Sequence, residues 1–131
     1  IGWAGETADS HDGVDAARSG AIGHSESSWM ESTVEGPGSI SFWWKVSSEN
    51  GYDYLTFYID NVEQAKISGS VSWQNELFNL GTGVHTVAWI YEKDVSVSRG
   101  SDAGWVDQVG LVAGTSRTNA GLPWLQLLLD E

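Results

Sequence analysis

The stretch GPGSISFWWKVSSENGYDYLTFYIDN, residues 36–61, decides the fold. Apolar and polar residues alternate through it in two runs, and this two-residue period is typical of β-strands with one buried face. In the first run the alternation places these side chains inward: Ile40, Phe42, Trp44 and Val46. In the second run it turns Leu55, Phe57 and Ile59 inward, and the Asp-Asn pair that follows indicates a turn. Two amphipathic strands are therefore predicted here.

The rest of the chain continues this pattern. It has 16 Gly and only 2 Pro, with short apolar runs between Gly, Ser and Asn. VHTVAWIYE is apolar on both faces, and its alternation turns Val87, Trp89 and Tyr91 inward. We predict an all-β domain, a two-sheet antiparallel β-sandwich of the jelly-roll type, over residues 1–112. Residues 113–131 read as a linker followed by a short apolar C-terminal segment that docks on this domain, a neighbouring domain or a second copy.

Charge and composition exclude several function classes. The 6 Lys and Arg against 18 Asp and Glu give a net charge of -12, which repels nucleic acid and anionic membrane surfaces. There is no cysteine for thiol chemistry, the three histidines lack a metal-ligand spacing, and no nucleophile motif is present. We therefore expect no enzyme. The chain begins without Met and without a signal peptide pattern, so we expect a module cut from a longer protein.

Three longer segments carry a resemblance to a known group of domains. They are DGVDAARSGAIGHSESSWMESTV, GPGSISFWWKVSSENGYDYLTFYIDNVEQAKISGSVSWQ and GTGVHTVAWIYEKDVSVSRGSDAGWVDQVGL. Together they resemble a bacterial module of secreted and cell-surface proteins, similar to MAM-like, cleaved-adhesin and carbohydrate-binding jelly rolls. The match covers residues 12–112. It implies a non-catalytic extracellular accessory domain, with a structural calcium ion joining the first and last strands.

The residues give calcium some independent support. In WVDQVGL the alternation places Asp107 on one face with Trp105, Val109 and Leu111, so its carboxylate lies near the core and needs a partner. Calcium, bound by carboxylate and carbonyl oxygens, is one such partner. The predicted ligands are Asp12, Asp15 and Asp107, followed by Asp53 and Asp102. The alternative is that Asp107 accepts backbone N–H bonds while the acidic N-terminal loop is only solvated.

The aromatic residues suggest a ligand. Trp44, Trp89 and Trp105 fall on inward faces and are expected in the core. The remaining candidates lie on outward faces, at strand edges or in loops: Trp29, Trp43, Tyr52, Tyr54, Tyr58 and Trp73. Flat aromatic faces stack on pyranose rings while amides and carboxylates bond the hydroxyls. The nearby polar candidates are Gln64, Gln74, Asn75 and Glu76. The alternative is that crossing loops cover these rings.

These observations predict an accessory module of a larger secreted or cell-surface bacterial protein that binds polysaccharide and carries a structural calcium ion. The alternative is an adhesion or spacer domain whose aromatic residues contact neighbouring domains. Exposure of the rings distinguishes the two functions: a glycan site leaves at least two rings open to solvent, whereas a spacer buries them.

Overall fold

The computed structural model describes residues 3–6, 10–11, 16–20, 26–93 and 103–114. Its seven strands are β1 (Ala4–Glu6), β2 (Ala16–Arg18), β3 (Ser27–Ser47), β4 (Tyr54–Ile59), β5 (Val62–Ser68), β6 (Ser70–Glu92) and β7 (Ala103–Ala113). They form one antiparallel sheet in the order β1-β2-β7-β3-β6-β4-β5. The predicted all-β class is confirmed. Within this described part, no helix is long and apolar enough to cross a membrane.

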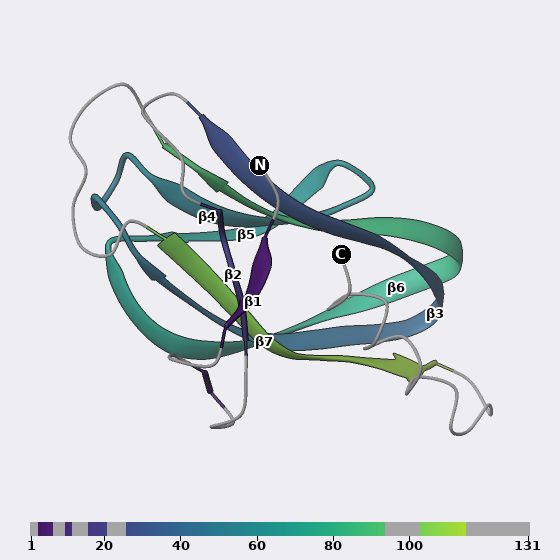
Figure 1. Ribbon diagram of the computed structural model, residues 1–131. Coiled ribbons are helices and arrows are strands. Elements are labelled where there is room, and N and C mark those ends of the chain that lie inside the picture. Colours follow the sequence, from purple (N-terminus) through teal and green to yellow (C-terminus); the bar gives the residue numbers. More distant parts are fainter. Residues whose placement is uncertain (1–2, 7–9, 12–15, 21–25, 94–102, 115–131) are drawn as a thin grey trace.

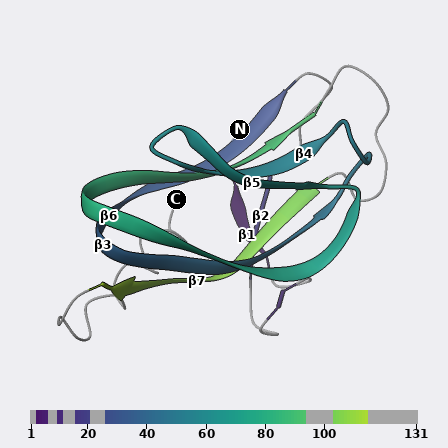
Figure 2. The same ribbon diagram turned by 180° about the vertical axis from the view of Figure 1, so that it is seen from behind.

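Two long strands, β3 and β6, fold this sheet over on itself (Figures 1 and 2). Residues 27–35 of β3 and 84–92 of β6 lie with β4 and β5 in one layer, which we call the β4 layer. Residues 38–47 of β3 and 70–80 of β6 lie with β7, β2 and β1 in the other, the β7 layer. The predicted sandwich is thus confirmed, and a continuous hydrogen-bonded sheet supplies both of its layers.

Glycines make the fold-over possible. The register of β3 against β6 shifts between Gly36 and Gly38, where both strands bend. A Cβ atom on Gly36 would overlap the carbonyl oxygen of Gly81, and one on Gly38 would overlap the carbonyl oxygen of Val112. The backbones approach each other too closely for any side chain, so glycine is required at both positions. The Gly36–Pro37 peptide bond between them is cis.

An aromatic cluster joins the two layers. Phe42 of the β7 layer packs against Phe57 and Trp89 of the β4 layer, with ring centroids 4.8 and 5.3 Å apart. The inward positions predicted from the first run are all buried, as are Leu55, Phe57, Val87, Trp89 and Tyr91, while Ile59 packs against the cluster from its edge. The alternation of the sequence therefore identified the core correctly on β3, β4 and β6.

Strand β7 departs from the alternation. Trp105 pairs with the outward Lys45 and Val106 with the inward Trp44, whereas Leu111 pairs with the inward Ile40. Gln108 has a φ of 53° and the register shifts beside it, so two β7 residues lie opposite one β3 residue. This is a β-bulge, and it reverses the faces along the strand.

The predicted face of β7 was therefore wrong in part. Trp105 and Asp107 are buried, as expected, but they lie on the outer face of the β7 layer. Val109 belongs to the core, and Leu111 packs against it. Trp105 accordingly does not take the core position that was predicted alongside Trp44 and Trp89.

Candidate functional site

The six aromatic residues predicted to contact a ligand lie in three places. Trp43 and Trp73 are on the outer face of the β7 layer, where both contact His11. Trp29, Tyr54 and Tyr58 are on the outer face of the β4 layer, because their strand neighbours point into the core. Tyr52 is exposed in the loop between β3 and β4. The sequence therefore predicted two opposite faces as if they were one site.

On the β7 layer, His11 covers Trp43. The two rings are stacked, with centroids 3.8 Å apart and planes inclined by 14°. The backbone N–H of His11 donates to Asp107 Oδ2 at 2.8 Å, and its Nδ1 contacts Gln108 Oε1. These anchors hold the imidazole on the indole, so one face of the Trp43 ring is already occupied by the protein itself.

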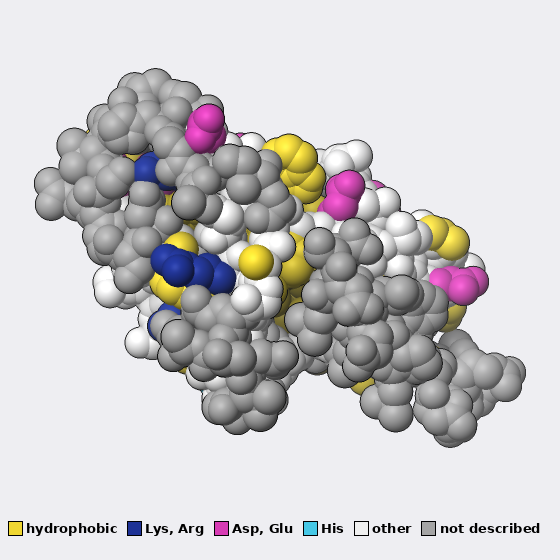
Figure 3. All heavy atoms as spheres, viewed as in Figure 1, with side chains coloured by type: hydrophobic (Ala, Val, Ile, Leu, Met, Phe, Trp, Pro, Cys, Tyr) yellow, Lys and Arg dark blue, Asp and Glu magenta, His cyan; other side chains and the backbone are white. Residues whose placement is uncertain are grey.

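The neighbouring rings of this layer also contact side chains of the protein. The Lys45 ammonium lies 5.5 Å from the centroid of Trp73 and 4.7 Å from that of Trp105, within cation–π range. The Arg18 guanidinium lies 5.3 Å from Trp105. In Figure 3, a group of Lys and Arg side chains on this face lies beside hydrophobic ones. The aromatic rings of the β7 layer are thus engaged within the domain.

The outer face of the β4 layer carries one exposed ring and two partly exposed ones, whereas Trp43 and Trp73 on the other layer are both only partly exposed. Trp29 is 47% exposed, and Tyr54 and Tyr58 are partly exposed. We call these three residues the aromatic platform. Trp29 on β3 and the tyrosines on β4 are separated by one strand, β6, and hence by roughly 10 Å between backbones. That separation is on the scale of a short oligosaccharide.

Smaller side chains lie between the platform rings. Trp29 pairs with Ile90, which pairs with Thr56 on β4. Tyr58 pairs with Ala88, which pairs in turn with Glu31 on β3. Thr56 and Ala88 are only 2% and 8% exposed, since larger neighbours flank them.

The platform is acidic at its margins. Glu92 pairs with Tyr54, and Glu63 pairs with Tyr58. Burial raises the pKa of the Tyr58 hydroxyl, and the negative charges of Glu92 and Glu63 raise it further. Lys66, which pairs with Thr56 on β4, places its ammonium 4.6 Å from the centroid of the Tyr54 ring. The face thus combines aromatic rings, carboxylates and hydroxyls.

The polar partners predicted from sequence do not gather at this platform. Asn75, with its neighbours Gln74 and Glu76, belongs to the part of β6 that runs in the β7 layer, and its Nδ2 donates to the carbonyl of Phe42. Gln64 lies on β5 and donates to the carbonyl of Val62. Glu31, Glu63 and Glu92 were not predicted as ligand contacts. The alternation does place Glu31 on the outward face with Trp29. The positions of Glu63 beside Tyr58 and of Glu92 beside Tyr54 become apparent only when the strand pairing is known.

The five predicted calcium ligands can be placed only in part. Asp12, Asp15 and Asp102 lie outside the described residues. Asp107 accepts backbone N–H bonds from His11 at 2.8 Å and from Gln108 at 2.7 Å, which is the alternative role considered for it. Asp53 is fully buried in the loop before β4, and its N–H donates to the carbonyl of Glu49. Across the parts of the chain that the structure describes, no three potential metal ligands lie together. Calcium therefore stays a prediction.

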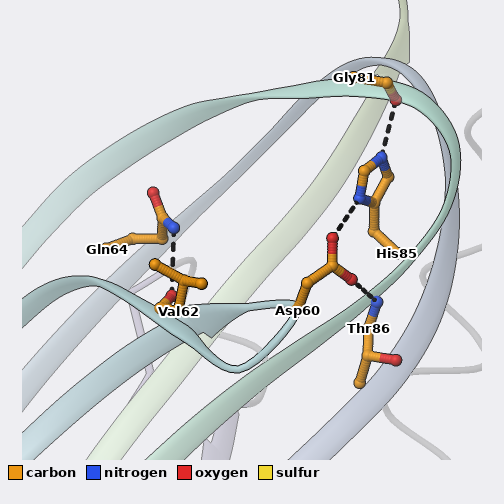
Figure 4. A network of polar contacts seen from close by, with 6 residues as sticks. All are labelled: Asp60, Val62, Gln64, Gly81, His85 and Thr86. Atoms are coloured by element: carbon orange, nitrogen blue, oxygen red, sulfur yellow. Dashed lines mark hydrogen bonds and ion pairs between the residues drawn. The ribbon is translucent and has the colours of Figure 1, made fainter.

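A polar network that the sequence did not reveal ties the β4–β5 turn to β6 (Figure 4). His85 Nδ1 lies 2.7 Å from Asp60 Oδ2, and His85 Nε2 lies 2.8 Å from the carbonyl oxygen of Gly81. Asp60 Oδ1 also accepts the backbone N–H of Thr86. Both acceptors around the ring favour the doubly protonated imidazole, so these contacts raise the pKa of His85 and lower that of Asp60.

Comparison with known proteins supports the fold. No family model and no curated protein matches the sequence. Part of the secreted serine protease VesC from Vibrio cholerae is similar in structure, with a TM-score of 0.68 and 15% identity over 76% of this chain and 22% of that chain. TmCBM61, solved in complex with beta-1,4-galactotriose, has a TM-score of 0.48 and 18% identity over 78% of this chain and 72% of that chain. The first similarity is strong enough to establish a shared fold with part of a longer protein.

Proposed function

We propose that this domain is a non-catalytic accessory module of a larger secreted protein, and that it binds carbohydrate through the aromatic platform. The observation that carries the proposal is the presence of Trp29, Tyr54 and Tyr58 on one outer face. Trp29 is the most open of the three, with 47% of its surface exposed. An exposed indole beside two partly exposed phenol rings offers aromatic surface that a ligand can cover.

The chemistry of the platform suits sugar rings. The axial C–H groups of a pyranose carry partial positive charge and stack on the negative face of an aromatic ring. The tyrosine hydroxyls and the carboxylates of Glu31, Glu63 and Glu92 can bond the sugar hydroxyls. Because the platform lies on paired strands, its rings are held at fixed spacing and lose little conformational freedom on binding.

An extracellular setting is part of the proposal. The domain that shares this fold makes up 22% of the length of a protein described as secreted. By this argument the present domain is one unit of a longer chain. We further propose a structural calcium ion held by Asp107 together with Asp12 and Asp15, with Asp53 and Asp102 as secondary candidates.

Affinity electrophoresis of the domain through plant, algal and microbial polysaccharides tests the binding proposal. We expect retardation by one polysaccharide class, and we expect Trp29→Ala and Tyr58→Ala to lower the affinity by at least about tenfold, or 1.4 kcal/mol. Trp73→Ala, on the opposite layer, is the matched control and should bind as the unaltered domain does. Retardation that disappears with Trp73→Ala alone would move the site to the β7 layer.

A spacer or adhesion domain is the second candidate. It is favoured by the β7 layer, where His11 is stacked on Trp43 and Trp105 is buried beneath Arg18 and Lys45. A spacer is expected to bury its aromatic residues in this way. Failure of every polysaccharide to retard the domain would select this candidate.

A further inference from the structure

The platform carries an excess of negative charge on its own face. Glu31 lies in the same cross-strand row as Ala88 and Tyr58, Glu63 is the other partner of Tyr58, and Glu92 is the partner of Tyr54. All three carboxylates are exposed. They raise the question of which sugars the rings can accept, since a ligand that stacks on Tyr58 or Tyr54 must lie beside these charges.

The structure already contains an ammonium group on this surface. Lys66 Nζ lies 4.6 Å from the centroid of the Tyr54 ring, a distance at which the ring attracts a cation. Lys66 reaches this position from β5, where it pairs with Thr56. The domain thus shows, with its own side chain, that an ammonium is accommodated on a platform ring beside Glu92.

We infer that the platform binds glycans built from amino sugars whose amino groups are free and protonated, and that it rejects glycans carrying carboxylate or sulfate groups. This inference rests on the proposed function, because it assigns a charge class to the ligand of the same site. The aromatic rings stack on the pyranose rings. Glu31, Glu63 and Glu92 accept charge-assisted hydrogen bonds from the ammonium groups.

The energies support a preference rather than an absolute requirement. Each exposed ion pair contributes little by itself, so two or three pairs together produce a preference of about tenfold. A uronate or a sulfate ester carries the same negative charge as these carboxylates and is therefore repelled by them. Salt weakens both effects, since the charges are exposed.

Calorimetric titration of the full chain with three oligosaccharides of equal length tests the inference. They are a glucosamine oligomer with free amino groups, its fully N-acetylated counterpart, and a galacturonate oligomer. All three titrations are made at a pH below the pKa of the sugar amino group, so that this group is protonated. We expect the glucosamine oligomer to bind about tenfold more tightly than the N-acetylated one, and the galacturonate not to bind. Replacing Lys66 by Gln is expected to strengthen the first interaction, because it frees the Tyr54 ring.

Matched variants separate a site from general attraction to an acidic chain. Glu31→Gln should lower the preference for free amino groups by about threefold. Glu35→Gln removes the same charge from the same strand, four residues and roughly 13 Å away, and should leave the preference unchanged. Trp29→Ala keeps the net charge of -12 and should abolish binding. Tight binding of the glucosamine oligomer by the Trp29 variant would overturn the inference.

The outcomes also separate the inference from the proposed function. If a neutral or acidic oligosaccharide binds as tightly as the glucosamine oligomer, and Trp29→Ala removes that binding, the charge preference is wrong and carbohydrate binding stands. If Trp29→Ala changes the binding of no polysaccharide or oligosaccharide, both are wrong.

Discussion

Gly36 and Gly81 meet where the sheet folds over, and a Cβ atom on Gly36 would overlap the carbonyl oxygen of Gly81. The approach is one-sided, because a Cβ atom on Gly81 would meet nothing within 4 Å. These two glycines lie on β3 and β6, the two strands of the described residues that run through both layers. Their contact therefore determines whether one sheet can supply both faces of the core.

The pair allows a matched test of the bend. Gly36→Ala forces two backbone segments apart, and we expect it to lower the melting temperature by more than about 5 °C. Gly81→Ala adds a methyl group in open space and should leave the melting temperature unchanged or slightly higher, since alanine restricts the unfolded chain. Thermal unfolding followed by circular dichroism measures both. Equal effects of the two substitutions would contradict the close approach at Gly36.

Phe42 links the layers, and its removal should be costly. Its ring contacts Trp44, Phe57, Phe78 and Trp89. We expect Phe42→Ala to lower the free energy of unfolding by about 3–5 kcal/mol, which is a large share of the stability of a domain of this size. Leu77→Ala is the control, because the Leu77 side chain on β6 is exposed. It should change the free energy of unfolding by no more than about 0.5 kcal/mol. Urea denaturation measures both free energies of unfolding. A loss for Phe42→Ala as small as that of the control would show that Phe42 does not belong to the core.

The network of His85 and Asp60 predicts a pH dependence. The pKa of His85 is raised in the folded domain, so its contribution to stability is complete below about pH 6.5 and is lost as the pH rises through the folded pKa. The pKa of Asp60 is lowered, so its contribution is present above about pH 3.8 and is lost as the pH falls through the folded pKa. The network is therefore most stabilising between these values.

His85→Gln isolates this effect from other titrating groups. The melting temperature of the unaltered domain should fall further between pH 6 and pH 8 than that of this variant. His11→Gln, at the other layer, is the control and should keep the steeper dependence. If the melting temperatures of the unaltered domain and the His85 variant change with pH in parallel, protonation of His85 does not contribute to the stability of the fold.

Asp107 tests the calcium proposal. Its two backbone hydrogen bonds predict that Asp107→Ala lowers the melting temperature even in chelator. If calcium also binds there, adding calcium should raise the melting temperature of the unaltered domain and not that of the variant. A melting curve of the unaltered domain that is the same in EDTA and in calcium would contradict the metal site and leave the hydrogen bonds as the role of Asp107.

Sequence alternation predicted the core well where strands are regular. It placed Phe42, Trp44, Leu55 and Trp89 correctly, because each strand has one face against the opposite layer. It failed on β7, where the bulge at Gln108 adds a residue and moves Trp105 and Asp107 to the outer face. No residue pattern in GWVDQVGLV marks that bulge.

The candidate site was predicted less well for a different reason. Parity shows that Trp29 and Trp43 both point outward, but not that β3 carries one of them into each layer. The only sequence signal for the bend at Gly36 is the short motif Gly-Pro-Gly at residues 36–38. The carboxylates beside the platform come from three strands, so their proximity depends on a pairing order that the sequence does not state.

The measurement that tests the account most directly is the two-dimensional NMR spectrum of the eight indole N–H groups, recorded during titration with the oligosaccharide that binds most tightly. The Trp29→Phe variant assigns the Trp29 signal. We predict that this signal shifts on titration, while those of Trp43 and Trp73 stay in place. Shifts confined to Trp43 and Trp73 would contradict the platform on the β4 layer and place the ligand on the opposite face.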